Sequence, residues 1–508
     1  MIKDSCLKSI KGSRLNSLEL TRKGFNTLLD LLIEKGIMVH AACGGHGRCG
    51  KCRVKLKGRI NAPTQLEKKL IPQHMIKQGY RLACQYVIKG SRLEFTRKGF
   101  IKGLRLKSLK DSSLEFFSLE LTRKDFIRRC GLALDLGTTV IKGARVDLGR
   151  CEVLSFAKIY NPQNFDGADV MTRISAALSG RYDILRRRLL NGVSAVTKEL
   201  GFAADASVPI PTAVAGNPVM SSFYLGKPVA GLARYPYAGA ITKNIRRNKP
   251  PVFIFGSIGG FVGGDTIAGI LASGLHKRSG ASFYIDLGTN GEIALLAKRR
   301  IHALSAAAGP AFEGAGLECG SLAIPGAIDA ITDAGHRCFR VHTIGNKKAH
   351  GICASGLIDL LAVLLRRGWL TRHGRLTRTV KVSGISVGQG DIRQLQLAIG
   401  AIHTGLEFLM EHAGVGASDI TDAVITGEFG SHLRIASLYQ IGIIPTGLRA
   451  VRLERDLPLK GAVSALCDDR VHKDAEIIRG RSRHIELAMQ PDFQQRFVKA
   501  LQLAPWNR

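Results

Sequence analysis

Four cysteines near the N-terminus are the first residues whose type and spacing could do chemistry. Cys43, Cys49 and Cys52 lie in the glycine-rich segment C-G-G-H-G-R-C-G-K-C, and Cys84 follows in R-L-A-C-Q. Thiolates spaced C-x5-C-x2-C…C are typical of a [2Fe–2S] site, with a first gap one residue longer than in the plant-type pattern. A zinc site is the alternative, but it usually has two paired knuckles, and only one C-x2-C pair occurs here. The array therefore predicts a one-electron redox centre.

Two copies of D-L-G-T are the second such group. Each follows an apolar run, in G-L-A-L-D-L-G-T-T-V over residues 131–140 and in S-F-Y-I-D-L-G-T-N-G-E-I over residues 282–293. Glycine lets the backbone approach phosphate oxygens, while amides and hydroxyls donate to them. An aspartate at the end of the strand can hold Mg²⁺, usually through water. One such loop is weak evidence, but two facing loops would form a clamp for a nucleotide.

Glycine-rich turns elsewhere in the chain strengthen this interpretation. A-A-A-G-P-A-F-E-G-A-G-L-E-C-G covers residues 306–320, and T-G-E-F-G-S-H-L covers residues 426–433. Turns of this kind can accept an adenosine, although any one of them could equally be a tight connection between helix and strand. G-I-C-A-S-G-L-I-D-L-L, residues 351–361, is expected to start a helix after small residues. Together the loops predict ATP and Mg²⁺ as ligands.

The elements that must position these residues follow from apolar spacing. Residues 26–35 have helical periodicity, residues 51–57 alternate as a strand, residues 65–71 can form a short helix, and residues 81–95 return as strand around the fourth cysteine. This order of elements agrees with the ligand spacing of a ferredoxin. From Gly131 onward the composition becomes that of a glycine-rich α/β protein. We therefore expect a small redox domain followed by a larger nucleotide-binding body.

Composition limits the class of protein. Hydrophobic residues make up 45% and charged residues 22% of the 508 residues, which is typical of a globular chain. The 11 cysteines are an odd number, and no leader pattern opens the chain, so we expect a cytoplasmic protein with free thiols. The longest apolar stretch, Pro250 to Leu275, contains Asp265 and several glycines. It is interpreted as buried strand, loop and helix, so no membrane contact is expected.

The net charge of +34 is unusual. Basic residues are not interleaved with aromatic ones, so nucleic acid is a disfavoured partner. Docking to an acidic protein and a merely solvated basic surface both stay open. S-L-E-L-T-R-K-G-F at residues 17–25 recurs in similar form at residues 91–100 and 118–126, and no function follows from this repeat.

The chain resembles the superfamily that contains acetate and sugar kinases, heat-shock chaperones and actin. More closely, it resembles the reductive activators of corrinoid proteins over residues 26–95 and 131–450. The matching stretches besides the cysteine loop are N-P-Q at 161–163, G-A-D-V-M-T-R-I at 167–174, A-G-N-P-V-M at 215–220, V-G-G-D-T-I-A-G-I-L at 262–271 and I-G-I-I-P at 441–445, together with the D-L-G-T and glycine-rich loops.

The resemblance implies roles for individual residues. Cys43, Cys49, Cys52 and Cys84 would bind the [2Fe–2S] cluster, and Asp135, Asp286 and Glu292 would be catalytic, with Glu292 and Glu313 placing water or Mg²⁺. The nucleotide would be held by Gly137, Thr138, Thr139, Gly288, Thr289, Asn290, Gly291, Gly309, Pro310, Gly427 and Gly430. For Gln163, Asp169, Arg173 and Asn217 a functional and a structural role stay open.

The implied fold is multidomain. A β-grasp ferredoxin-like α+β domain over residues 1–100 and a basic connector over 101–130 precede a two-lobed α/β actin-like ATPase domain over 131–470. The lobes would cover about 131–278 and 279–450, with a C-terminal tail over 471–508. Relatives usually have a further domain where only the connector stands here.

The implied function is ATP-dependent reduction of a corrinoid protein from Co(II) to Co(I), by one electron from the cluster. The implied partners are the corrinoid protein of a methyltransferase system and a reduced ferredoxin or other low-potential electron donor; a homodimer is left open. Alternatives are an ATP-driven electron donor to another low-potential acceptor, a small-molecule kinase with a fused ferredoxin, and an iron–sulfur carrier or nucleotide-gated binding module without turnover.

Overall fold

The computed structural model divides the chain into two compact units, each of which is described by itself. One consists of residues 1–113 and 163–168, and the other of residues 114–162 and 169–508. The structure describes residues 27–29, 32, 37–38, 47, 50, 52–57, 60–87, 94–95, 101–102 and 129–506, without 168, 203–208, 249–250, 289, 315, 336–337 and 428–432.

The first unit contains a small antiparallel sheet in which β2 (Arg53–Lys57) lies between β3 (Tyr80–Leu82) and β4 (Glu94–Phe95). β1 (Ile37–Met38) pairs with β5 (Ile101–Lys102), and α2 (Gln65–Leu70) and α3 (Gln73–Lys77) connect β2 to β3. The predicted strand at 51–57 and helix at 65–71 are confirmed within one or two residues. The predicted continuous strand over 81–95 is wrong, because a turn separates β3 from β4.

A buried glutamate joins α2 to the sheet. Glu67 is 1% exposed, and its carboxylate accepts from the backbone N–H of Thr64 in a capping box and from that of Leu82 at the end of β3, each at 2.8 Å. The carboxylate thus satisfies backbone donors that burial would otherwise leave unpaired. This contact fixes the chain two residues before Cys84.

The second unit contains two six-stranded sheets of related topology. In the first sheet the order is β10 (Ile245–Asn248), β11 (Pro251–Ile254), β9 (Thr212–Gly216), β6 (Cys130–Leu136), β7 (Val140–Asp147) and β8 (Glu152–Tyr160). In the second it is β21 (Ala450–Leu453), β20 (Ile420–Gly427), β12 (Ala281–Leu287), β13 (Gly291–Ala297), β14 (Arg300–Ala306) and β22 (Ser482–His484). In both sheets an antiparallel three-stranded meander continues into parallel strands.

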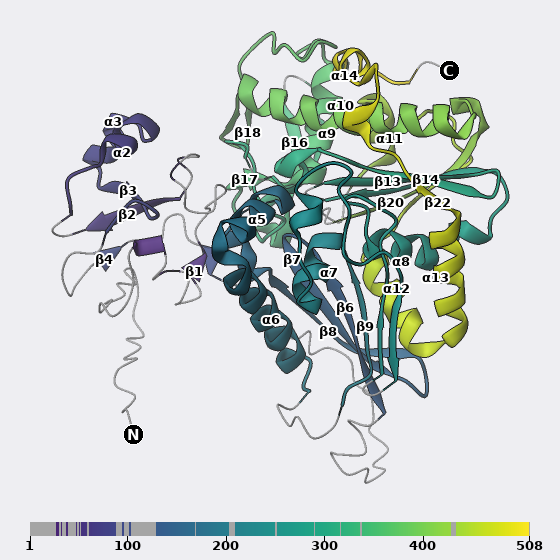
Figure 1. The fold of residues 1–508 in the computed structure, drawn as a ribbon. Coiled ribbons are helices and arrows are strands. Elements are labelled where there is room, and N and C mark those ends of the chain that lie inside the picture. Colours follow the sequence, from purple (N-terminus) through teal and green to yellow (C-terminus); the bar gives the residue numbers. More distant parts are fainter. Residues whose placement is uncertain are drawn as a thin grey trace, which may run out of the picture. The chain divides into compact units, whose positions relative to one another are not determined.

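Helices cover both outer faces of the sheets and fill the space between them (Figure 1). The first sheet carries α5 (Val170–Ala176), α6 (Tyr182–Glu199) and α7 (Pro218–Leu225). The second carries α9 (Ala354–Arg366), α10 (Gln389–Ala413), α11 (Ile435–Gln440) and α14 (Phe493–Ala500). Between the sheets lie α8 (Gly264–Ser273), α12 (Leu457–Cys467) and α13 (Asp469–Arg481), in a core shared by both. Smaller sheets join β15 (Ala327–Asp333), β16 (Phe339–Thr343) and β17 (Gly351–Ile352), and β18 (Val380–Val382) with β19 (Ile385–Val387).

The central helix α8 has a glycine where it crosses the second sheet. Gly269 lies against the ring of Tyr284 on β12, and a Cβ at this position would overlap the Tyr284 hydroxyl. A glycine inside a helix costs about 1 kcal/mol relative to alanine, so close contact is the reason for it here. The apolar stretch 250–275 thus folds as the predicted strand, loop and buried helix, and among the described residues no helix could span a membrane.

Two features differ from expectation. Cys151 and Cys467 form a disulfide between the β7–β8 turn and the end of α12, although free thiols were expected. Residues from 471 onward, expected as a tail, contain most of α13, and β22 pairs with β14. The side chain of Trp506 is buried in the core under the second sheet and donates to the carbonyl oxygen of Gly442 at 2.7 Å.

Candidate functional site

Two of the predicted cluster ligands are described, and their sulfur atoms converge. Cys52 and Cys84 are 1% and 6% exposed, and their Sγ atoms lie 3.2 Å apart without forming a disulfide. The hydrogen bond from Cys52 is the main cause that lowers the pKa of the Cys84 thiol to about 7. Thiolate character is what an iron ligand needs, so this pair fits a metal cluster. Cys43 and Cys49 lie outside the described residues.

The two D-L-G-T segments meet at a cavity in the second unit. Asp135 and Asp286 are each the penultimate residue of a central strand, β6 and β12, so the two sheets present equivalent strand ends to the same space. The cavity is lined by Asp135, Gly137, Thr138, Thr139, Val140, Lys142, Asn217, Asp265, Asp286, Gly288, Asn290, Glu292, Thr426, Gly427, Asp456 and Pro458.

Buried polar side chains hold the first loop in place. Arg173 Nη2 donates to the carbonyl oxygen of Thr138 at 2.7 Å, and Asn161 Nδ2 donates to that of Gly137 at 3.0 Å. Asn217 Nδ2 donates to Thr138 Oγ1 at 2.9 Å while Asn217 Oδ1 caps α7. These contacts indicate that Arg173 and Asn217 position the loop.

The turn after β6 also requires glycine. A Cβ at Gly137 would lie 2.5 Å from the carbonyl oxygen of Val140, closer than any side chain allows. Glycine thus allows the tight turn that brings the chain to the edge of the cavity, as a phosphate-binding loop needs. Asp169, whose role was left open, caps α5 through a 2.8 Å hydrogen bond from the Thr172 N–H.

The cavity is strongly acidic. Burial is the main cause that raises the pKa of Asp135 to about 8 and that of Asp265 to about 7, and neighbouring carboxylates raise both further. Burial, followed by Asp265 and Asp286, raises the pKa of Glu292 well above its ordinary value. Lys142 Nζ forms an ion pair with Asp456 at 2.8 Å and opposes the shift at Asp135. One cation among five carboxylates leaves an excess of negative charge that a bound cation would neutralise.

The donor set suits a hard cation such as Mg²⁺, which prefers oxygen ligands and keeps several of its waters. Within the described residues, no three His, Cys, Asp or Glu side chains are close enough to hold a metal ion directly. Carboxylates that surround the cavity at greater distance fit an ion held through water, as expected for Asp135 and Asp286.

The structure brings most of the predicted nucleotide-site residues to the cavity. Gly291 does not line it, because it faces Ile402 on α10, and the backbone of Gly309 lies outside the lining as well. Thr289, Gly430 and the side chains of Pro310 and Glu313 lie outside the described residues.

Four polar residues that line the cavity had no individual role predicted from the sequence: Lys142, Asp265, Thr426 and Asp456. Asp265 could have been assigned to the site, since it is the one charged residue in a long apolar stretch. No sequence feature marks Lys142 and Asp456, because they are far apart in the chain and form an ion pair only in the fold.

Comparison with known families divides the chain into three segments. Residues 17–89 match the 2Fe-2S iron-sulfur cluster binding domain, residues 130–278 the RACo middle region, and residues 280–507 the C-terminal domain of RACo, the ASKHA domain. The fold and these matches define a protein with a ferredoxin-type domain joined to an actin-like ATPase domain. The predicted fold class is confirmed.

Similar proteins point to one family. The corrinoid activation enzyme RamQ of Eubacterium limosum is 30% identical over 417 residues, which cover 72% of this chain and 69% of RamQ. The [Co(II) methylated amine-specific corrinoid protein] reductase of Methanosarcina barkeri is 27% identical over 361 residues, 62% of this chain and 66% of that protein. A solved structure named reductive activator for corrinoid, iron-sulfur protein has the same fold, with a TM-score of 0.66, 24% identity and coverage of 94% and 96%. The chain belongs to the family of reductive activators of corrinoid proteins.

Proposed function

We propose that this chain uses ATP to drive the one-electron reduction of a corrinoid protein from Co(II) to Co(I). One observation supports this most: a single chain combines the cysteine array with a cavity that both D-L-G-T loops enter. The proposed partner is the corrinoid protein of a methyltransferase system, and a reduced ferredoxin or similar low-potential protein in the cytoplasm supplies the electron.

The redox part of the proposal rests on four thiolates. A [2Fe–2S] cluster bound by Cys43, Cys49, Cys52 and Cys84 supplies one electron at a time. Cys52 and Cys84 contribute two converging sulfurs in an apolar core, where Leu28, Leu32 and Leu82 exclude water. Burial in this way protects a cluster from solvent and tunes its potential.

The nucleotide part rests on the acidic cavity. Mg²⁺ held through water by Asp135, Asp286 and their neighbours would supply positive charge to the phosphates of ATP. Amides of the Gly137 turn and the hydroxyls of Thr138 and Thr139 donate to phosphate oxygens. Gly288 N–H donates to the carbonyl oxygen of Asn290 at 3.1 Å and thereby shapes the second turn. Thr426 Oγ1 is buried, has no partner among the described residues and adds one further donor. Glu292, whose pKa burial and the neighbouring Asp265 and Asp286 raise well above its ordinary value, orients the attacking water.

Energy coupling requires that ATP bind two conformations with different affinity. The cavity is lined from both sheets, so closure of the lobes around ATP and reopening after hydrolysis would change their relative position. ATP and water give ADP and phosphate, while in the partner complex one electron passes from the reduced cluster to Co(II). The nucleotide thereby favours the state of the complex in which Co(I) forms.

An anaerobic mixing experiment tests the proposal. The reduced protein is mixed with a Co(II) corrinoid protein, and the cobalt spectrum is followed with and without Mg-ATP. We expect Co(I) to accumulate only with Mg-ATP. An intact cluster and continued ATP hydrolysis without any change at cobalt would reject the corrinoid as acceptor.

A cysteine variant tests the redox part separately. Cys84→Ser should remove the visible chromophore and the reduction of cobalt, but leave Mg-ATP binding unchanged. Cys338→Ser is the matched control, because Cys338 is exposed and distant from the predicted ligands in sequence. Normal cobalt reduction by Cys84→Ser would exclude this residue as a cluster ligand.

A further inference from the structure

A second cavity lies away from the acidic one, at the connection between the two lobes. Its volume is about 460 Å³, within the range of small-molecule sites. It is formed by residues 275–280 after α8, by the hairpin between β13 and β14, and by α13. The two ATPase-domain family segments meet between residues 278 and 280, so this cavity contains the covalent link between them.

The lining is strongly basic. Six of its sixteen residues are Lys or Arg, compared with 74 of 508 in the whole chain, so the high net charge does not account for the enrichment. The basic residues are Lys277, Arg278, Lys298, Arg299, Arg300 and Arg481, and Asp474 is the one carboxylate in the lining.

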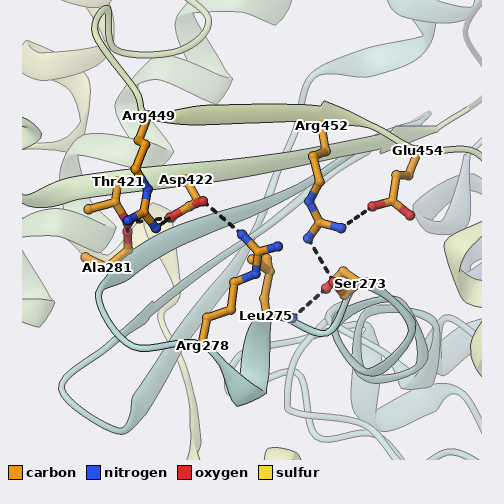
Figure 2. Close-up of polar contacts among 9 residues, drawn as sticks. All are labelled: Ser273, Leu275, Arg278, Ala281, Thr421, Asp422, Arg449, Arg452 and Glu454. Carbon is orange, nitrogen blue, oxygen red and sulfur yellow. Dashed lines mark hydrogen bonds and ion pairs between the residues drawn. The ribbon is translucent and has the colours of Figure 1, made fainter.

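Some of these basic side chains form ion pairs within the protein. Arg278 forms an ion pair with the buried Asp422 at 2.9 Å, and Figure 2 shows Arg449 reaching the same carboxylate from the other side. Lys277 Nζ lies 3.5 Å from Asp474. Within the described part of the chain, Arg299, Arg300 and Arg481 form no ion pair. Three guanidinium groups are therefore left for an external anion.

The hairpin that carries these charges has an unfavourable backbone. Lys298 and Arg299 occupy its two turn positions with φ values of 50° and 62°. Turns of this type favour Asn-Gly, because a side chain at positive φ is strained. Residues held in strained conformations concentrate at functional sites. Both turn residues line the cavity; the Lys298 ammonium donates to the carbonyl oxygen of Gly414 at 2.7 Å.

The floor of the cavity is apolar. Leu275, Ile301 and Ile478 are buried there, whereas Ile477 on the same rim is 48% exposed. His276 also lines the cavity, and its Nε2 lies 3.8 Å from the carboxylate of Asp474. An apolar floor and a cationic rim suit a ligand with an apolar body and an anionic group.

We propose that this basic cavity is a second ligand site, which binds a small organic phosphate ester. A phosphate monoester has three free oxygens, which match three guanidinium groups, and Arg binds such groups with paired hydrogen bonds. The apolar part of the ester covers Ile477 and the cavity floor. The basic residues line a concave cavity, which favours a small molecule. An acidic protein segment would be expected to bind basic residues on an open surface instead.

The test uses 1-naphthyl phosphate as probe and the complete cluster-loaded protein in EDTA. Without Mg²⁺ the acidic cavity repels anions, so calorimetry reports the basic cavity. We expect saturable binding with one probe per chain, tighter than that of inorganic phosphate or 1-naphthol. Absence of saturable binding, or equal affinity for inorganic phosphate, would reject the proposal. Tighter binding of hexaglutamate would assign the cavity to an acidic protein segment and would also overturn it.

Matched variants locate the binding site. Arg299→Gly with Arg481→Gln should raise the Kd for the probe at least tenfold. Arg299→Gly alone relieves the strained turn, so its Tm should not fall, and misfolding would not explain the loss. Arg247→Gln with Lys381→Gln removes two exposed cations elsewhere and should change the Kd less than twofold. Equal losses in both pairs would show only an effect of net charge and would contradict the assignment.

Discussion

The acidic and the basic cavity lie at opposite ends of the same elements. α8 begins at the acidic cavity, with Asp265 in its first turn, and the residues after its last turn line the basic one. β13 likewise has Glu292 near one end and Leu296 and Ala297 at the other. One helix and one strand of the central core thus connect two sites of opposite charge.

Burial distinguishes the two cavities more than charge does. The carboxylates of the acidic cavity are removed from water, so the pKa of Asp135 and of Asp265 is raised and the fold is destabilised when they ionise. Arg299, Arg300 and Arg481 are exposed, and water stabilises their charge in the empty site. The comparison indicates that the acidic cavity depends on a bound cation, whereas the basic cavity is ready to accept an anion.

The substitution Asp286→Ala should separate the two cavities most clearly, because it should affect ATP turnover at the acidic cavity and leave ligand binding at the basic cavity unchanged. This change removes a carboxylate that we place beside the phosphates, and we expect ATP turnover to fall more than 100-fold, or by about 3 kcal/mol of transition-state stabilisation. The cluster spectrum and the binding of 1-naphthyl phosphate should stay normal. The control is Asp333→Asn, at an exposed carboxylate paired with Arg367. Unchanged turnover would show that Asp286 does not act at the phosphates.

The sequence predicted which residues of the acidic cavity lie at the ends of strands, but it did not predict which charged side chains pair there. Asp135 and Asp286 could be predicted because the same short motif ends two apolar strands, and in the first copy the close approach to Val140 requires glycine at Gly137. Asp265 could have been assigned from its isolation in an apolar stretch. The Lys142–Asp456 pair could not, because an ion pair between residues so far apart depends on how α12 lies between the sheets.

The basic cavity was not predicted at all. Its arginines come from three separate segments, and only the fold brings Arg278, Arg299, Arg300 and Arg481 together. The fold class was predictable because the succession of apolar segments and glycine turns along the chain, together with the family resemblance, implied it. The Cys151–Cys467 disulfide and the place of α13 were not, since both depend on contacts between distant segments.

The substitution Gly269→Ala in α8, the helix that connects the two cavities, should lower the stability of the protein. The added methyl group overlaps the Tyr284 hydroxyl, and α8 or β12 must shift, which we expect to cost about 2–3 kcal/mol in the free energy of unfolding. Urea denaturation measures this cost. The control is Gly390→Ala, where the added Cβ meets nothing within 4 Å and the helix should gain up to about 1 kcal/mol. A stability equal to that of the unmodified chain would mean that the contact with Tyr284 is not as close as the structure has it.

The substitution Asp265→Asn should show how much the buried Asp265 carboxyl destabilises the folded protein when it ionises. The pKa of Asp265 is raised from 3.8 to about 7, so between these pH values the folded chain holds a proton that the unfolded chain has released. Stability of the unmodified protein therefore falls as pH rises through this range, and the asparagine variant lacks this loss.

We expect the variant's advantage in the free energy of unfolding to grow from near zero at about pH 4 to on the order of 4 kcal/mol above about pH 7. The comparison is made without nucleotide and Mg²⁺, and Asp183→Asn on the exposed face of α6 is the control. A difference that does not change with pH would contradict the raised pKa.

The smallest predicted effect is the linkage between the cavities. α8 has ten residues and is about 15 Å long, so an anion in the basic cavity lies far enough from the ATP phosphates to act mainly through its charge. At such a distance one unit charge contributes about 0.5 kcal/mol at intermediate dielectric, and saturating 1-naphthyl phosphate should weaken Mg-ATP binding twofold to threefold. Mg-ATP must weaken binding of the probe by the same factor.

Salt distinguishes this electrostatic linkage from a structural one. At 1 M salt the Debye length is about 3 Å, so a linkage carried by charge alone should disappear. The two affinities are measured by calorimetry at 0.1 M and 1 M salt, with the Arg299→Gly, Arg481→Gln variant as a control that should show no linkage at either. If the linkage persists at 1 M salt in the unmodified protein, the connection between the lobes moves when the basic cavity is filled, and charge alone does not couple the two cavities.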